Sequence, residues 1–163
     1  MNAHSIDTSV YLVETATQDD DSIIASALAI LAARIKSGPL MGSSRAVREY
    51  LTVQASKHSD REVFSVLFLD AQNRAIEFRE LFFGTLTQIS VYPREVVRAA
   101  MHINAAAVIL THNHPSGNAK PSRADEVLTN TIKTALALVD VRVLDHIITA
   151  GGESCSMAEH GLI

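Results

Sequence analysis

The sequence predicts an α/β or mixed three-layer domain in which strands and helices alternate around one sheet. Short apolar, β-branched runs typical of buried strands alternate along the chain with stretches whose apolar residues recur at helical spacing. The chain has 163 residues, of which 47% are hydrophobic and 20% charged. This length and composition suit one folded domain with its own core and argue against disorder.

The N-terminal part is predicted to be a loose arm followed by helices. Residues 1–18 are polar and without pattern. Asp19-Asp20-Asp21-Ser22 then predicts the start of a helix, because acids are favoured beside its positive N-terminal dipole, and Gly38-Pro39 predicts its end. The apolar stripe of this helix is most simply explained by core packing, although it could also serve a dimer. A shorter helix is expected from Ser44 to Leu51.

The remaining elements follow from apolar patterning and from turn residues. Val63–Leu69 is apolar almost throughout, which favours a central strand buried on both faces. A second strand is expected over Ala75–Phe83 and a break at Gly84. The later elements are a helix from Pro93, a strand over 105–110, a helix from Ser122 to about Val139, and a strand from Val141 to Thr149 before a short tail.

His112-Asn113-His114 directly follows the strand predicted over 105–110. Side chains two apart on a strand point to the same face, so both imidazoles can converge on one point. Ser122 is placed to cap the next helix, and Asp125 falls in its first turn. Two imidazoles and one carboxylate form a three-ligand set for a catalytic zinc that keeps one position open for water. The alternative is a pair of histidines that are only hydrogen-bonded at a strand end.

A hydrolytic zinc site also needs a base and a donor for the developing oxyanion. Glu62, at the mouth of the first central strand, is the candidate base, and the Ser122 hydroxyl is the candidate donor. The alternatives are a solvated charge at Glu62 and a simple capping box between Ser122 and Asp125. His146 has two possible roles. It could be a partner of the site that Asp145 orients, or it could be an ordinary strand histidine.

Together, Glu62, His112-x-His114-Pro115 and Ser122-x-x-Asp125 resemble the JAMM motif of JAB1/MPN-type metalloproteases. From Ser44 to Ile163 the chain is more specifically similar to the bacterial RadC family. The matching stretches are Glu62–Phe64, Leu67–Asp70, Phe83–Thr85, Tyr92–Glu95, His112–Gly117, Pro121–Asp125 and Leu144–His146.

The resemblance implies a cytidine-deaminase-like fold, with a central mixed sheet flanked by helices. It also implies that His112, His114 and Asp125 bind zinc, that Glu62 activates the water, and that Ser122 supports the tetrahedral intermediate. On this basis we expect residues 1–43 to form an N-terminal arm and helix, and residues 44–163 the JAB1/MPN metalloprotease domain.

One departure from the family pattern bears on function. Longer RadC proteins carry an N-terminal helix-hairpin-helix region that binds DNA. Here the residues before Ser44 hold one predicted helix and show no Gly-rich hairpin pattern. The chain therefore resembles the short form found in mobile elements and prophages, and the DNA-repair label of the family is in question for it.

The composition and the absence of certain motifs exclude several kinds of site and of protein. The single cysteine, Cys155, excludes an internal disulfide and a zinc knot of paired cysteines. We find no signal peptide and no apolar stretch long enough for a membrane span, which favours the cytoplasm. The ligands of a zinc deaminase, His-x-Glu and Pro-Cys-x-x-Cys, are absent. The oligomeric state stays open.

The leading hypothesis is a zinc-dependent peptidase or isopeptidase acting on a peptide or protein substrate. The alternative is a DNA-repair-associated or mobile-element accessory protein in which the zinc domain binds a partner without cleaving it. A base candidate at Glu62 favours catalysis.

The charge of the chain predicts weak binding to nucleic acid. The formal net charge is −4, and no three basic residues cluster in the sequence. Because duplex affinity comes mainly from phosphate contacts by Lys and Arg, we expect weak non-specific DNA binding at physiological salt. Fluorescence anisotropy with a labelled duplex checks this. A tight complex whose affinity falls steeply with added salt would support the DNA-binding alternative instead.

Overall fold

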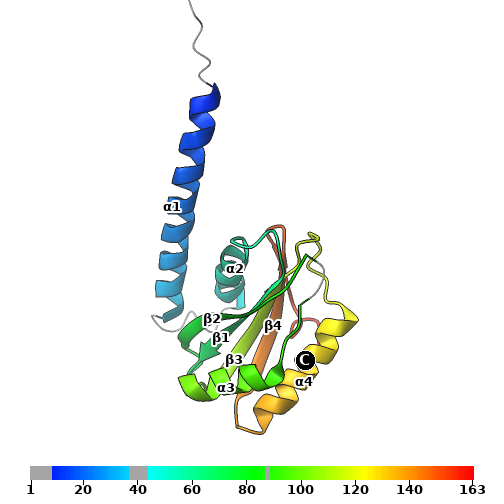
Figure 1. The fold of residues 1–163 in the computed structure, drawn as a ribbon. Coiled ribbons are helices and arrows are strands. Elements are labelled where there is room, and N and C mark those ends of the chain that lie inside the picture. Colours follow the sequence, from blue (N-terminus) through cyan, green and yellow to red (C-terminus); the bar gives the residue numbers. More distant parts are fainter. Residues whose placement is uncertain (1–8, 37–43, 87–88) are drawn as a thin grey trace, which may run out of the picture.

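The computed structural model describes residues 9–36, 44–86 and 89–163, which form four helices and five strands (Figure 1). In chain order they are α1 (Ser9–Lys36), α2 (Ser44–Ala55), β1 (Val63–Leu69), β2 (Ala75–Phe83), α3 (Pro93–Ile103), β3 (Ala107–Asn113), α4 (Arg123–Ala137), β4 (Arg142–Ala150) and β5 (Glu153–Ser156). The strands form one sheet in the order β2-β1-β3-β4-β5.

The sheet is mixed, as the family resemblance implied. β1 pairs antiparallel with both β2 and β3, β3 pairs parallel with β4, and β4 pairs antiparallel with β5. The connection between the two parallel strands runs through α4, since a parallel pair needs a crossover. β1 and β3 lie in the middle of the sheet, and both are buried along their whole length. The prediction of a central strand over Val63–Leu69 is therefore confirmed.

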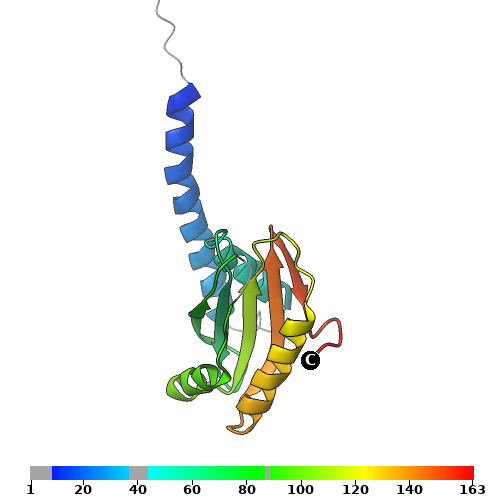
Figure 2. The ribbon, with the colours of Figure 1, turned by 45° about the vertical axis from the view of Figure 1, so that its right-hand side comes forward.

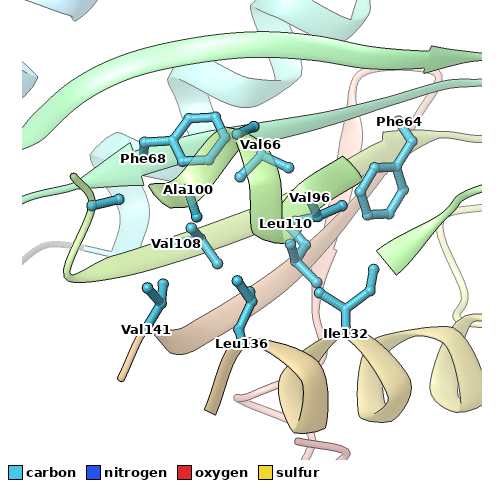
Figure 3. Close-up of a cluster of buried hydrophobic side chains, with 12 residues drawn as sticks. Phe64, Val66, Phe68, Val96, Ala100, Val108, Leu110, Ile132, Leu136 and Val141 are labelled. Atoms are coloured by element: carbon cyan, nitrogen blue, oxygen red, sulfur yellow. The ribbon is translucent and has the colours of Figure 1, made fainter. Parts of the chain in front are cut away.

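Helices cover both faces of the sheet, which gives three layers (Figures 1 and 2). α3 and α4 pack on one face, where Phe64, Phe68 and Leu110 of the sheet meet Ile132 and Leu136 of α4 (Figure 3). α1 and α2 pack on the other face. Their buried contacts there include Val47 and Leu51 of α2, Leu67 and Ile109 of the sheet, and Leu28 and Leu31 of α1. The predicted three-layer α/β architecture is confirmed.

The first helix is longer than the sequence predicted. α1 begins at Ser9, inside the segment expected to be a loose arm, and the acidic residues 19–21 lie in its middle. Neither glycine nor proline occurs between residues 9 and 36, so nothing interrupts the helix. The predicted stop at Gly38-Pro39 lies outside the described residues. Although α1 has 28 residues, the described chain contains no helix both long and apolar enough to cross a membrane.

Other boundaries also differ from prediction. β3 spans Ala107–Asn113 instead of residues 105–110, so it includes His112. α2 continues to Ala55 rather than ending at Leu51, because residues 52–55 contain no helix breaker. The C-terminal part, predicted to be a tail, contains β5. Gly151 and Gly152 join β4 to β5 with φ values of +56° and +88°, a backbone that favours glycine and suits a two-residue hairpin turn.

Candidate metal centre

The two histidines of the His-x-His sequence converge at the end of β3. His112 lies opposite Phe64 of β1 and faces the α4 side of the sheet, as residues 108 and 110 of the same strand do. His114 follows two residues later and takes the same side, and its Nε2 lies 2.9 Å from Nε2 of His112. The prediction that both imidazoles meet on one face is therefore confirmed.

Asp125 reaches this pair of rings from the first turn of α4. Ser122 caps the helix, and the Asp125 Oδ2 atom accepts hydrogen bonds from the Ser122 backbone N–H (2.7 Å) and hydroxyl (2.6 Å). Its Oδ1 atom lies 3.2 Å from His112 Nε2, and its Oδ2 atom 3.7 Å from His114 Nε2. The capping box considered as an alternative does form, and it presents the carboxylate to the histidines.

These three side chains could hold a metal ion. One ligand atom from each, two Nε2 atoms and a carboxylate oxygen, lie within 4.8 Å of one another. Two imidazoles and a carboxylate are a ligand set typical of catalytic zinc, to which each atom would bind at about 2.0–2.2 Å. Within the described residues, no other group of three histidine, cysteine or acidic residues meets this condition.

The electrostatics favour an ionised Asp125. Burial acts to raise the pKa of its carboxyl, but hydrogen bonding and charge from His112, with the two hydrogen bonds from Ser122, outweigh it. The pKa therefore lies well below the ordinary value. A metal ligand must be deprotonated, and this carboxyl meets that requirement.

The outward-facing ring nitrogens of both histidines also have partners. His114 Nδ1 lies 2.8 Å from the carbonyl oxygen of Asn118, and His112 Nδ1 lies 2.8 Å from Nε2 of His146. His146 is wholly buried, and its pKa is held well below the usual value, first by burial and then by the neighbouring His112 and His114. His146 is thus a neutral ring in direct contact with the site. Asp145 does not touch that ring, because its carboxylate accepts the backbone N–H of His146 instead.

Glu62 and Ser122 line the same cavity as two of the candidate ligands, His114 and Asp125. Its volume is about 600 Å³, and its wall consists of Glu62, Leu86, Ile89, Val91, His114, Pro115, Ser116, Ser122, Ala124, Asp125 and Leu128. Two backbone hydrogen bonds of 2.8 Å hold Glu62, from its N–H to the Thr85 carbonyl and from the Gly84 N–H to its own carbonyl. The sheet thus brings the candidate base to the same cavity wall as His114, 52 residues later in the chain.

Asn113 is a residue of the site that the sequence analysis did not single out. It lies between the two histidines but faces the opposite side of the strand, and it is only 6% exposed. Its Oδ1 accepts the Val63 N–H at 2.7 Å, and its Nδ2 donates to the carbonyls of His58 (2.7 Å) and Arg61 (2.8 Å). Asn113 therefore fastens the segment that carries Glu62 to the strand that carries the ligands. The available signal was an amide at the end of a buried strand, between two candidate ligands.

Zinc content tests the ligand assignment. We expect one zinc per chain, and we expect its loss from the double variant His112→Ala, Asp125→Ala, because one remaining imidazole cannot retain it. His112 borders the apolar core at Phe64, but the change removes none of the apolar side chains of the core, so the variant should still unfold cooperatively by circular dichroism. His102→Ala with Asp21→Ala changes the same residue types at exposed positions and should keep full zinc content. Stoichiometric zinc in the first variant, measured by elemental analysis, would show that the ligands are wrongly assigned.

Asn113→Ala should loosen the segment that carries Glu62 without removing a ligand. The change leaves one N–H and two carbonyls without their partner, so we expect the free energy of unfolding to fall by about 1–3 kcal/mol. Urea unfolding and amide hydrogen exchange at Val63 check this, and exchange there should accelerate. Asn130→Ala removes an amide from an exposed position of α4 and should leave both measurements nearly unchanged. Unaltered exchange at Val63 in Asn113→Ala would refute the fastening role.

Comparison with known proteins places this site in a family. A family model described as the RadC-like JAB domain matches residues 41–162. The chain is 60% identical over 134 residues to a UPF0758 protein of Methylibium petroleiphilum, covering 82% of this chain and 60% of that protein. It is 57% identical over 133 residues to a UPF0758 protein of Albidiferax ferrireducens, covering 82% of this chain and 56% of the relative. The chain thus spans less than two thirds of the length of these relatives. The fold, the His112, His114 and Asp125 cluster and the match over most of the chain together show that this protein belongs to the RadC family.

Proposed function

We propose that this protein is a zinc-dependent metallohydrolase that cleaves an amide bond in a peptide or isopeptide. The observation that carries the proposal is that His112, His114 and Asp125 meet, and that two of them, His114 and Asp125, line a cavity together with Glu62. Ligands alone would suit a structural metal. A carboxylate outside the ligand set, on the wall of an open cavity, is what hydrolysis additionally requires.

Each of these residues has a separate role in the proposed reaction. Zinc, when bound to this ligand set, would supply a Lewis acid that lowers the pKa of water to roughly 7. Glu62 receives a proton from the attacking water and passes it to the leaving nitrogen, so that the C–N bond breaks and an acid and an amine form. The Ser122 hydroxyl, now donating to Asp125, can turn about its Cα–Cβ bond and donate to the oxyanion of the substrate.

The cavity supports a polypeptide substrate. Leu86, Ile89 and Val91 line it from the segment after β2, and Leu128 lines it from α4. These side chains offer apolar contact to a side chain of the substrate next to the bond to be cleaved. An apolar wall with a few polar groups at one place is typical of a site that binds by shape and orients by hydrogen bonds. The sequence gives no ligand set for a deaminase, so water attack on an amide carbon is the reaction that these residues support best.

The variant Glu62→Gln tests the proposal, because the amide keeps size and polarity but cannot accept a proton. We expect the rate to fall by a factor of about 10² to 10⁴. Zinc content should stay at the wild-type value, since Glu62 is not a proposed ligand. The zinc-loaded protein is incubated with a peptide library and with lysine isopeptides, and new amino termini are counted by mass spectrometry. Zinc is measured in the same samples.

Glu77 of β2 is half-buried, as Glu62 is, but does not line the cavity, so Glu77→Gln is a matched control that should cleave like the unchanged protein. Full turnover by Glu62→Gln would eliminate Glu62 as the base. Loss of zinc from that variant would make Glu62 a ligand. If the unchanged, zinc-loaded protein cleaves none of these substrates, the hydrolase proposal loses its support and the partner-binding alternative gains it.

A further inference from the structure

His146 of β4 lies directly behind the candidate metal site, on the side away from the cavity. Its Nε2 atom is 2.8 Å from His112 Nδ1, and its Nδ1 atom is 2.6 Å from Thr129 Oγ1 of α4. Both His146 and Thr129 are wholly buried. The Phe64 ring packs against His146 with its centroid 5.7 Å away and at an angle of 72°. Both nitrogens of the His146 ring are therefore engaged inside the core.

The hydrogen-bond partners fix the direction of each bond in this chain. Thr129 Oγ1 lies 2.6 Å from the carbonyl oxygen of Asp125, which can only accept, so the single hydroxyl proton is donated there. Thr129 must then accept from the Nδ1–H of His146. A neutral imidazole with a proton on Nδ1 has a lone pair on Nε2. That lone pair accepts the Nδ1–H of His112, so the neutral form of His112, the form that can bind a metal, has its own lone pair on Nε2.

The nitrogen left free is the one that faces the other ligands. His112 Nε2 lies 2.9 Å from His114 Nε2 and 3.2 Å from Asp125 Oδ1. His114 also carries a proton on Nδ1, because this nitrogen faces the carbonyl oxygen of Asn118, which can only accept a hydrogen bond. Both ligand rings thus have Nδ1 engaged by a partner and Nε2 directed inward, toward the other ligands.

We propose that His146, oriented by Thr129, is a positioning residue that fixes the tautomer and the ring plane of the ligand His112. The inference rests on the proposed metal site and extends it. Through Thr129 the same chain of bonds ends on the backbone of Asp125, so it connects two of the three ligands across β3, β4 and α4. Partners of this kind typically change metal affinity about 10- to 100-fold when they are removed.

Zinc affinity of the full chain, measured by competition with a chromophoric chelator, provides the first test. We expect His146→Leu to weaken zinc binding about 10- to 100-fold, because His112 Nδ1 loses its acceptor. His146→Gln restores an acceptor at a similar reach and should recover most of that loss. His102→Leu, at an exposed position of α3, is the matched control and should bind zinc normally. Thr129→Val keeps the shape of the side chain but not its hydroxyl, and serves if leucine at position 146 prevents folding. It should also weaken zinc binding.

Long-range ¹⁵N–¹H correlation spectra of the histidine rings provide a test that a purely structural role would not pass. In the unchanged, zinc-free protein we expect His112 and His146 each to carry their proton on Nδ1. In Thr129→Val, His146 should no longer hold a single tautomer. A proton on Nε2 of His146, or unchanged zinc affinity in folded His146→Leu, would overturn the inference. A wild-type protein that binds no zinc would overturn the proposed function instead, while the zinc-free spectra would still decide the direction of the hydrogen bonds.

Discussion

The antiparallel register of β1 and β3 is the constraint on which the rest of the site depends. Phe64 lies opposite His112 in an antiparallel pair, so Glu62, two residues before Phe64, and His114, two residues after His112, reach the same end and the same face of the sheet. A slip of one residue would turn every side chain of one strand to the other face. The hydrogen bond from the Val63 N–H to Asn113 Oδ1 (2.7 Å) joins the two strands at this end and is compatible with the observed register only. The position of the proposed base relative to the ligands is thus a property of the strand register.

A second constraint acts through the start of α4. The Asp125 carboxylate receives two hydrogen bonds from Ser122 at the helix N-terminus, where negative charge is favourable, and still presents Oδ1 to His112. The requirements of helix capping and of metal binding therefore coincide in one side chain. Since the capping interaction exists without a metal, the carboxylate needs no rearrangement before one binds. Sequence reasoning opposed the capping box to the ligand role, yet the geometry combines them.

Local signals made much of this structure predictable, and non-local contacts account for what was missed. β1 and β2 have the predicted bounds because an apolar run and a polar turn mark them, and Ser122 caps its helix as its sequence context indicated. The start of α1 was missed because no breaker or cap distinguishes Ser9, and the acidic residues 19–21 gave a misleading signal. The bonds of Asn113 reach backbone groups 50 or more residues away. The contact of His146 with His112 requires the parallel pairing of β3 and β4. The sequence shows both residues but not the distant groups that they contact.

β5, which the sequence did not predict, closes the back of the site. The Asp145 carboxylate accepts hydrogen bonds from the backbone N–H groups of His146 and Ala158 and from the Ser156 hydroxyl, and so holds the end of β5 against β4. Met157 is thereby wholly buried, with its sulfur 3.7 Å from Thr129 Oγ1. Because water does not reach Thr129 or His146, no solvent molecule competes for their hydrogen bonds, and such bonds are stronger in a low-dielectric interior than in water. The last strand of the sheet thus contributes to the order of the ligands without supplying one.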